Sequence, residues 1–154
     1  MKTRIFITLF LTILIANCGF SPIYISNQKP INVLKVEIIG DKNLAFELEK
    51  KLNFTKGGSS ADQYSFKAQI YDSSESSLID SRGIPTEEII KLTISYQFED
   101  KNGVTVYQDS ISKDKRVAVT DNIPNNNLVK NNEKRQLLDS IVQNISFKTR
   151  LMLK

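Results

Sequence analysis

The residue with the most specific chemistry in this chain is Cys18, the only cysteine among 154 residues. Its thiolate form is a nucleophile, but one cysteine cannot form a disulfide within its own chain. It lies just after an apolar run over residues 5–16, which Lys2 and Arg4 precede. A basic start and an apolar run too short to cross about 30 Å of hydrocarbon are typical of a secretory signal peptide. We therefore expect residues 1–17 to be a cleaved signal peptide.

Residues 15–18 read Ile-Ala-Asn-Cys and resemble the lipobox of bacterial lipoproteins, in which an aliphatic residue and two small residues precede the modified cysteine. Asn17 departs from that pattern because it is larger and more polar than the usual residue. The resemblance implies that Cys18 carries a lipid, and two or more acyl chains hold a protein stably on a membrane. Because Gly19 replaces the aspartate that favours inner-membrane retention, we expect anchoring at the periplasmic face of the outer membrane. The alternative is an unmodified thiol after an ordinary signal peptide.

The sequence offers little for catalysis or metal binding. It contains no histidine, which removes the commonest general base and metal ligand. Two carboxylate pairs, Glu87-Glu88 and Glu99-Asp100, are sequence neighbours, and neighbours on a strand point to opposite faces. Each pair is therefore interpreted as a solvated turn edge. Glycine-rich phosphate loops, nucleophile elbows and HExxH motifs are absent from the sequence. We expect a protein that is not an enzyme and that needs no cofactor or metal.

The basic residues gather in short clusters. The whole chain has 21 basic and 17 acidic residues, but the expected signal peptide holds two of the basic ones, which leaves the mature chain at +2. This modest excess gives no reason to expect a nucleic-acid partner. One cluster comprises Lys113, Lys115 and Arg116 around Asp114, and others lie near residues 130–135 and 148–150. Such clusters are either ordinary surface charge or contacts for phosphorylated lipid headgroups, whose oxygens lysine and arginine bind.

The first expected elements of the mature chain are a strand over residues 33–39 and a helix over residues 44–54. In the strand, one face is expected to carry Leu34, Val36 and Ile38. Asp41 or Asn43 can cap the helix. Its apolar face follows a four-residue spacing through Leu44, Leu48 and Leu52.

Alternating residues then predict a run of strands. Residues 64–70 and 90–98 alternate apolar and polar side chains, and the second run is the clearest such pattern in the chain. Between them, the serine-rich stretch 72–81 either extends the first strand or loops out. Asn-Gly within residues 100–103 predicts a hairpin, with the returning strand over residues 104–119. Each strand has one polar face, as in antiparallel sheets that are covered on one side.

The chain ends with a polar loop, expected over residues 120–132, and an amphipathic helix, expected over residues 133–152. Its apolar stripe comprises Leu138, Ile141, Val142, Ile145 and Met152. The order β-α-β-β-β-α predicts an α+β two-layer sandwich, a four-stranded, mostly antiparallel sheet packed against two helices. We expect a lipidated cysteine and tether over residues 18–31 and a single domain over residues 32–154.

Residues 18–24, Cys-Gly-Phe-Ser-Pro-Ile-Tyr, resemble the start of lipopolysaccharide-assembly lipoproteins of the LptE type, especially the alphaproteobacterial branch. The expected element order is similar to that family's fold. The resemblance implies a partner, the large LptD-type outer-membrane β-barrel that inserts lipopolysaccharide, within which the lipoprotein sits as a plug and whose assembly it assists. It also implies lipopolysaccharide binding near one end of the sheet, for which Lys113, Lys115 and Arg116 are the candidate residues.

Three other functions compete with this one. An auxiliary lipoprotein of a periplasmic lipid ABC-type transporter would hold acyl chains in an apolar groove. A structural lipoprotein that ties the membrane to the cell wall would be a long helix with heptads, which the alternating strands contradict. A hydrolase would need a pair of nucleophile and base that the sequence does not show.

Overall fold

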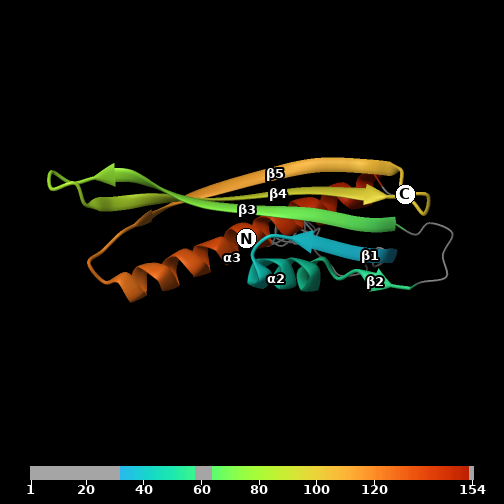
Figure 1. Ribbon diagram of the computed structural model, residues 1–154, viewed down its shortest axis with the longest axis horizontal. Helices are drawn as coiled ribbons and strands as arrows, with labels where there is room; N and C mark the ends of the chain where they lie inside the picture. Colours follow the sequence, from blue (N-terminus) through green and yellow to red (C-terminus); the bar gives the residue numbers. More distant parts are fainter. Residues whose placement is uncertain (1–31, 58–63, 153–154) are drawn as a thin grey trace, which may run out of the picture.

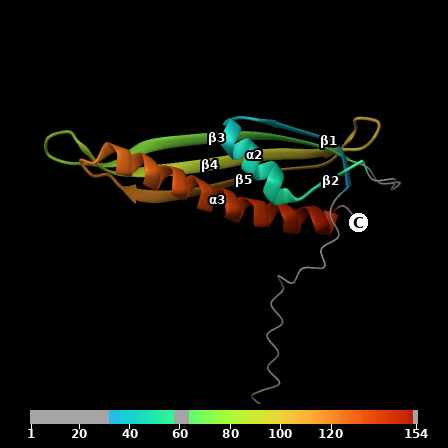
Figure 2. The same cartoon turned by 90° about the horizontal axis from the view of Figure 1, so that it is seen from below.

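The computed structural model describes residues 32–57 and 64–152, and it has two layers, with a mixed sheet on one side and two helices on the other (Figures 1 and 2). The elements are β1 (Asn32–Ile39), α2 (Lys42–Leu52), β2 (Thr55–Lys56), β3 (Tyr64–Ile79), β4 (Pro85–Glu99), β5 (Thr105–Ala118) and α3 (Ile123–Met152). The predicted α+β sandwich is confirmed. Its sheet has five strands rather than four, because the two-residue strand β2 adds to one edge.

The strand order in the sheet is β2-β1-β3-β4-β5. β1 runs parallel to β2 and β3, since α2 carries the chain back before the next strand begins. β3, β4 and β5 form an antiparallel meander whose strands are 16, 15 and 14 residues long. The serine-rich stretch therefore extends β3 to Ile79. Because the meander is longer than β1, the sheet is elongated and continues as a hairpin beyond the short strands (Figure 1).

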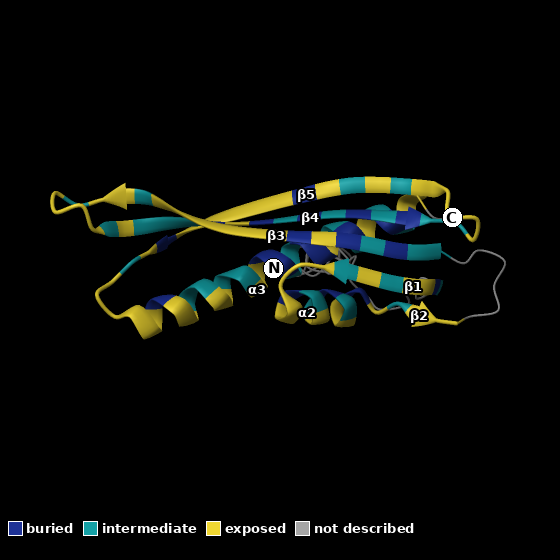
Figure 3. Cartoon of the chain, in the orientation of Figure 1, coloured by how far each residue is buried: buried dark blue, intermediate teal, exposed yellow. Residues whose placement is uncertain are grey.

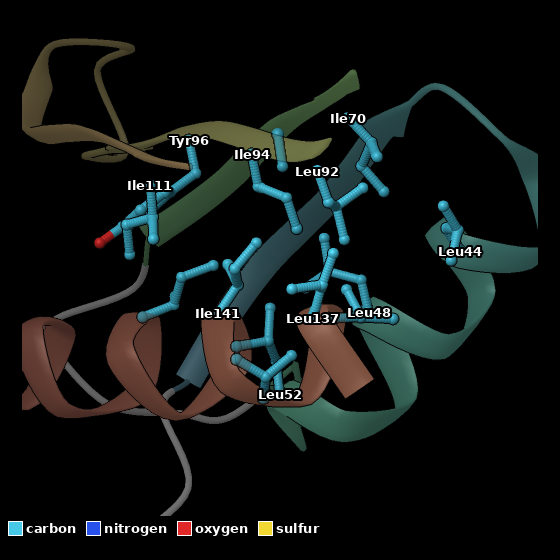
Figure 4. Packing of buried hydrophobic residues seen from close by; sticks show 14 of the residues in the cluster. Leu44, Leu48, Leu52, Ile70, Leu92, Ile94, Tyr96, Ile111, Leu137 and Ile141 are labelled. Atoms are coloured by element: carbon cyan, nitrogen blue, oxygen red, sulfur yellow. The ribbon is translucent and has the colours of Figure 1, made fainter. Parts of the chain in front are cut away.

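The core lies between the sheet and the helices (Figure 3). Every second residue of β4 from Ile90 to Phe98 is buried, as the alternation predicted. Figure 4 shows side chains of both helices pointing towards those of β4. The buried helix residues are Leu44, Leu48 and Leu52 of α2, and Leu137, Leu138, Ile141, Val142 and Ile145 of α3.

One end of this core is aromatic, and we call it the aromatic end: residues 64–70 of β3 with residues 94–99 of β4. The ring of Phe66 lies 5.0 Å from that of Phe98 and 4.9 Å from that of Phe54. Phe66 and Phe98 are fully buried. Tilted ring contacts of this kind add to the stabilisation from burial alone.

The prediction for the apolar face of β1 is partly wrong. The sheet register shifts between Val33 and Lys35, so that Leu34 is an extra residue in the strand, as in a β-bulge. The bulge turns Val33 into the core and leaves Leu34 45% exposed. Val36 and Ile38 pack against the core as predicted. A pattern of strict alternation cannot reveal a single inserted residue.

α2 begins at Lys42 and ends at Leu52, two residues earlier at each end than expected. Of the two predicted caps, Asp41 is the one that caps the helix. Its carboxylate accepts hydrogen bonds from the backbone N–H groups of Asn43 and Leu44, at 2.9 and 3.0 Å. These bonds satisfy amides that lack partners within the helix. Asn53 ends the helix in the left-handed conformation.

The predicted loop over residues 120–132 is wrong for most of its length, because α3 begins at Ile123. Asn122 caps the helix by accepting a hydrogen bond from the N–H of Asn125 at 3.1 Å. Pro124 fits the first turn, where its missing N–H costs nothing. The buried Asn126 closes the junction, because its amide oxygen accepts from the hydroxyl of Thr120 at 2.9 Å and its amide nitrogen donates to the Thr120 carbonyl at 2.6 Å.

The rest of α3 follows the prediction except at its end. Four residues of the predicted stripe are buried, but Met152 is 62% exposed. At 30 residues, α3 is about 45 Å long and runs along most of the sheet (Figure 2). Within the residues that the structure describes, no helix is both long and apolar enough to cross a membrane.

The two turns of the meander share one design. In each, an aspartate carboxylate accepts hydrogen bonds from the N–H groups two and four residues later, Asp80 in the β3–β4 turn and Asp100 in the β4–β5 turn. Gly83 and Gly103 occupy the position of positive φ, at 83° and 79°. These bonds lower the pKa of both carboxyls, first through the N–H of Ile84 and of Val104 respectively. The predicted hairpin at Asn-Gly is confirmed.

Candidate functional site

The part of the meander farthest from the aromatic end is a projecting hairpin, residues 75–89, which we call the distal hairpin (Figure 1). None of its residues is buried. Around its turn it exposes three large apolar side chains, Leu78, Ile79 and Ile84, at 57%, 60% and 44%. Large apolar side chains that stay exposed around one turn are candidates for contact with a partner. Sequence analysis did not single them out, although they flank the Arg82-Gly83 turn.

α3 begins at the same end of the molecule as the distal hairpin (Figure 1) and contacts the base of that hairpin. The N–H of Val119 donates to the carbonyl of Thr86 at 2.9 Å, and Lys130 pairs with Glu88 at 2.6 Å. The first turns of this helix expose Ile123 and Leu128. We call the distal hairpin and residues 123–128 together the distal end.

The three predicted ligand-binding residues lie on β5 next to this end, but not on one face. Lys113 and Lys115 point to the helix side of the sheet, whereas Arg116 points to the open side, because side chains alternate along a strand. Lys115 pairs with Glu133 of α3 at 2.5 Å. Arg116 is 3.9 Å from Glu87 and is largely exposed. Lys113 has no ion pair among the described residues. A role for these three residues in binding stays a prediction.

Glu87 and Glu88 of the distal hairpin take part in ion pairs. Glu88 accepts hydrogen bonds from Lys130 of α3 and from the hydroxyl of Ser74 at 2.5 Å. These bonds, that of Lys130 first, lower the pKa of Glu88. Lys134 pairs with Asp72 at 2.5 Å, which ties α3 to β3. Glu87 and Glu88 point to opposite faces as expected. They are half-buried ion-pair partners, so their interpretation as a solvated turn edge is corrected.

The face of the sheet away from the helices carries many hydroxyl, amide and charged side chains. Cross-strand hydroxyl pairs join β4 to β5, between Thr93 and Ser112 at 2.9 Å and between Ser95 and Ser110 at 3.0 Å. A shallow hollow of about 310 Å³ lies on this face, lined by Glu37, Ile39, Lys67, Ala68, Gln69, Ser95, Tyr96, Gln97 and Gln108. Apart from exposed side chains such as Ile39 and Tyr71, this face is polar and suits a polar surrounding.

Other predicted features cannot be placed. The lipidation site Cys18, the signal peptide over residues 1–17 and the tether over residues 18–31 lie outside the described residues. Within residues 32–57 and 64–152, no three histidine, cysteine, aspartate or glutamate side chains gather as a group able to hold a metal ion.

Comparison with known proteins relates the chain to solved structures rather than to sequences. No family model and no curated protein matches it. A minor lipoprotein from Acinetobacter baumannii has a similar structure, with a TM-score of 0.58, 17% identity and coverage of 77% of this chain and 92% of that one. Lipoprotein B from Nitrosomonas europaea has a TM-score of 0.60 and 9% identity, with coverage of 79% of this chain and 86% of that one. Rare lipoprotein B from Shewanella oneidensis has a TM-score of 0.53 and 13% identity, with coverage of 76% of this chain and 98% of that one. The chain therefore has a fold that is also found in bacterial lipoproteins.

Proposed function

We propose that this chain is a lipid-anchored outer-membrane lipoprotein of the LptE type, which partners and plugs the LptD-type β-barrel and assists lipopolysaccharide transport. The observation that carries the proposal is a coincidence of two independent features. Residues 15–24 combine a lipobox with the start typical of these lipoproteins. The domain that follows has a fold found in bacterial lipoproteins over three quarters of the chain.

The open sheet face supports the role of a plug. The lumen of a large outer-membrane barrel is polar. A domain inside it needs a surface that hydrogen-bonds without requiring burial of apolar groups, and the hydroxyl and amide side chains of β4 and β5 provide one. The elongated sheet would run along the lumen.

The distal end supports contact with an amphipathic partner. Lipopolysaccharide carries phosphate groups and acyl chains, and this end combines exposed apolar side chains with exposed cations. Arg82 at the turn belongs to this end, and Lys113 and Arg116 lie next to it on β5. Arginine and lysine bind phosphate oxygens through charge-assisted hydrogen bonds. We therefore keep Lys113, Lys115 and Arg116 as proposed lipopolysaccharide contacts, and we propose that the protein acts by binding rather than by catalysis.

A pull-down tests the barrel partnership. The tagged full chain is purified in mild detergent from its own membranes, and its partners are identified by mass spectrometry. Recovery of a large outer-membrane β-barrel in near-equal amount is the expected result. Recovery of an ABC-type permease instead would support the transporter alternative, and recovery of neither would contradict the proposal. A Cys18→Ala variant should lose its lipid mass and its membrane anchoring.

A binding assay tests the lipopolysaccharide contacts. Replacing the three β5 cations by glutamine should lower affinity for purified lipopolysaccharide, and the loss should shrink at high salt because screening weakens exposed charge pairs. The matched control replaces three exposed lysines elsewhere, Lys35, Lys56 and Lys101. Equal losses in both variants would show a general charge effect and contradict the assignment.

The transporter alternative has weaker support. Such a protein would hold acyl chains in an apolar groove. The hollow on the open face and those beside α2 are shallow and open to solvent, and charged or polar residues form part of each lining. Acyl chains would gain little on entering them.

A further inference from the structure

The outward face of α2 carries an exposed aromatic ring between two lysines. Lys42, Phe46 and Lys50 are four residues apart and lie on the side opposite the buried leucines. Phe46 is 68% exposed, as much as any large apolar side chain of the described residues. Leaving a phenylalanine in water forgoes the stabilisation that burial provides. Nothing in the packing of the domain accounts for this ring.

The two lysines differ from the cations around them. Lys51 pairs with Asp139, Lys56 with Glu49 at 2.5 Å and Arg135 with Glu47 at 3.0 Å. Among the described residues, by contrast, Lys42 and Lys50 form no ion pair. The ion pairs nearby neutralise most of the surface and leave two free positive charges beside Phe46.

Helix stability does not explain Lys42. It is the first residue of α2, whose first turn contains no acidic residue. A positive charge at that position opposes the helix dipole, whereas Lys50 in the last turn favours it. Lys42 therefore adds no stability to the helix through the dipole, and its charge is available to a negative partner.

The surface around Phe46 is hollowed on both sides. A depression of about 360 Å³ is lined by Phe46, Glu49, Lys50, Asn53, Phe54 and Lys56. A second, of about 480 Å³, is lined by Asn43, Phe46, Glu47, Lys50, Lys51 and Arg135. The ring therefore stands as a ridge between two recesses that can receive headgroups.

We infer that the outward face of α2 docks on an anionic phospholipid surface, with Phe46 at the level of the headgroups and Lys42 and Lys50 on lipid phosphates. Phenylalanine is among the side chains by which peripheral helices enter the membrane interface, and lysines near an anionic surface add attraction. The inference rests on the lipid anchor of the proposed function but not on the barrel. A tether of 14 residues, 18–31, reaches at most about 50 Å, and α2 is about 16 Å long. An anchored chain can therefore bring α2 to its own membrane.

The absence of tryptophan from the chain allows a direct test. The mature lipidated Phe46→Trp chain is reconstituted in vesicles of phosphatidylcholine alone or with phosphatidylglycerol, and mass spectrometry confirms the lipid. The anchor holds the chain on both kinds of vesicle, so a difference between them reports docking of α2. In the anionic vesicles we expect a blue-shifted emission, quenching by brominated lipid and a several-fold loss of quenching by aqueous acrylamide, which is uncharged and is not repelled by the anionic surface. Adding Lys42→Gln and Lys50→Gln should abolish the difference.

The matched control is Tyr71→Trp, an exposed position on the open side of the sheet. Its emission should be the same in both kinds of vesicle. Equal acrylamide quenching of the position-46 indole in both would overturn the inference, as would a response to soluble lipopolysaccharide but not to the anionic vesicles. A chain that lacks the lipid mass would instead contradict the anchoring part of the proposed function, so the two failures are distinguishable.

Discussion

The aromatic end and the distal hairpin are two stretches of the same pair of strands, yet they differ in what packs on them. At the aromatic end, Phe66 and Phe98 are fully buried beneath the helices. In the distal hairpin, none of residues 75–89 is buried, and ion pairs such as Glu88 with Lys130 hold it to α3. The turns at the two ends have the same aspartate-glycine design. Local turn chemistry therefore forms both the β3–β4 and the β4–β5 hairpin. Of the two ends, only the aromatic end contributes to the core.

This difference indicates a division of roles. Burial of apolar area dominates stability, and exposed ion pairs add little to it. The aromatic end should therefore hold the fold, whereas the distal hairpin can be changed without unfolding the domain. Apolar side chains that stabilise nothing in the isolated chain, such as Leu78 and Ile79, are free to serve a partner.

The largest effect is expected at the aromatic end. Phe66→Ala removes a buried ring that contacts both Phe54 and Phe98, and should destabilise the domain by about 3–5 kcal/mol. Chemical denaturation monitored by circular dichroism measures the loss. The matched change in the distal hairpin, Leu78→Ala, should cost less than about 0.5 kcal/mol. Similar losses in the free energy of unfolding at the two sites would contradict the proposed difference between the two ends.

The second-largest loss of stability is expected at Gly40, the glycine that follows β1. Gly40 has a φ of 137°, and a Cβ there would lie 2.7 Å from the carbonyl oxygen of Ile70. Gly40→Ala therefore adds a clash to backbone strain, and we expect a loss of about 2–3 kcal/mol in the free energy of unfolding. In the distal turn, Gly83 also has positive φ but has open space around it. Gly83→Ala should cost only about 1 kcal/mol, and a larger cost than at Gly40 would contradict the assignment.

A change at the junction that precedes α3 should have an intermediate effect on stability. Asn126→Ala removes the amide that both accepts from and donates to Thr120, and leaves the carbonyl of Thr120 without that bond. We expect a loss of about 1–2 kcal/mol in stability. Hydrogen exchange should show faster exchange in the first turns of α3 and unchanged protection in β4. Uniformly faster exchange would show that the junction supports the whole core.

The smallest predicted effect on stability is that of Glu88, and it should depend on pH. The pKa of Glu88 is lowered below its usual 4.5 by Lys130, so its ionised form is stabilised in the folded state. Its contribution, about 1 kcal/mol, should be present above pH 4.5 and lost as the pH falls through the folded-state pKa. Unfolding of the wild-type chain and of Glu88→Gln should therefore differ at pH 7 and converge in acid. A difference that persists at pH 2 would indicate lost packing rather than lost charge.

Most of the fold could be predicted from the sequence because most of it follows simple periodicities. The alternation in residues 90–98 and the leucine spacing of α2 both correctly identified buried faces. The errors came from features that have no period. The bulge at Leu34 inserts one residue, and the first turns of α3 form in an asparagine-rich stretch because Asn122 caps them and Asn126 bonds Thr120.

The candidate surfaces were harder to predict. Three cations close together in the sequence, Lys113, Lys115 and Arg116, suggested one cluster, but strand alternation divides them between two faces. The exposure of the apolar side chains in the distal hairpin depends on how far α3 covers the sheet, and this is a tertiary property that local sequence does not reveal. The free lysines beside Phe46 could be recognised only after the ion pairs of their neighbours were known.

The most direct test of the central claim compares the two ends for partner binding. One full-length variant replaces the distal apolar residues Leu78, Ile79 and Ile84 by serine, and the control replaces exposed apolar residues towards the other end, Val104, Val106 and Phe147. Both should unfold at the wild-type denaturant midpoint. In pull-downs from native membranes, the distal variant should lose most of the β-barrel while the control retains it. Full recovery with the distal variant, or equal loss from both, would contradict the claim.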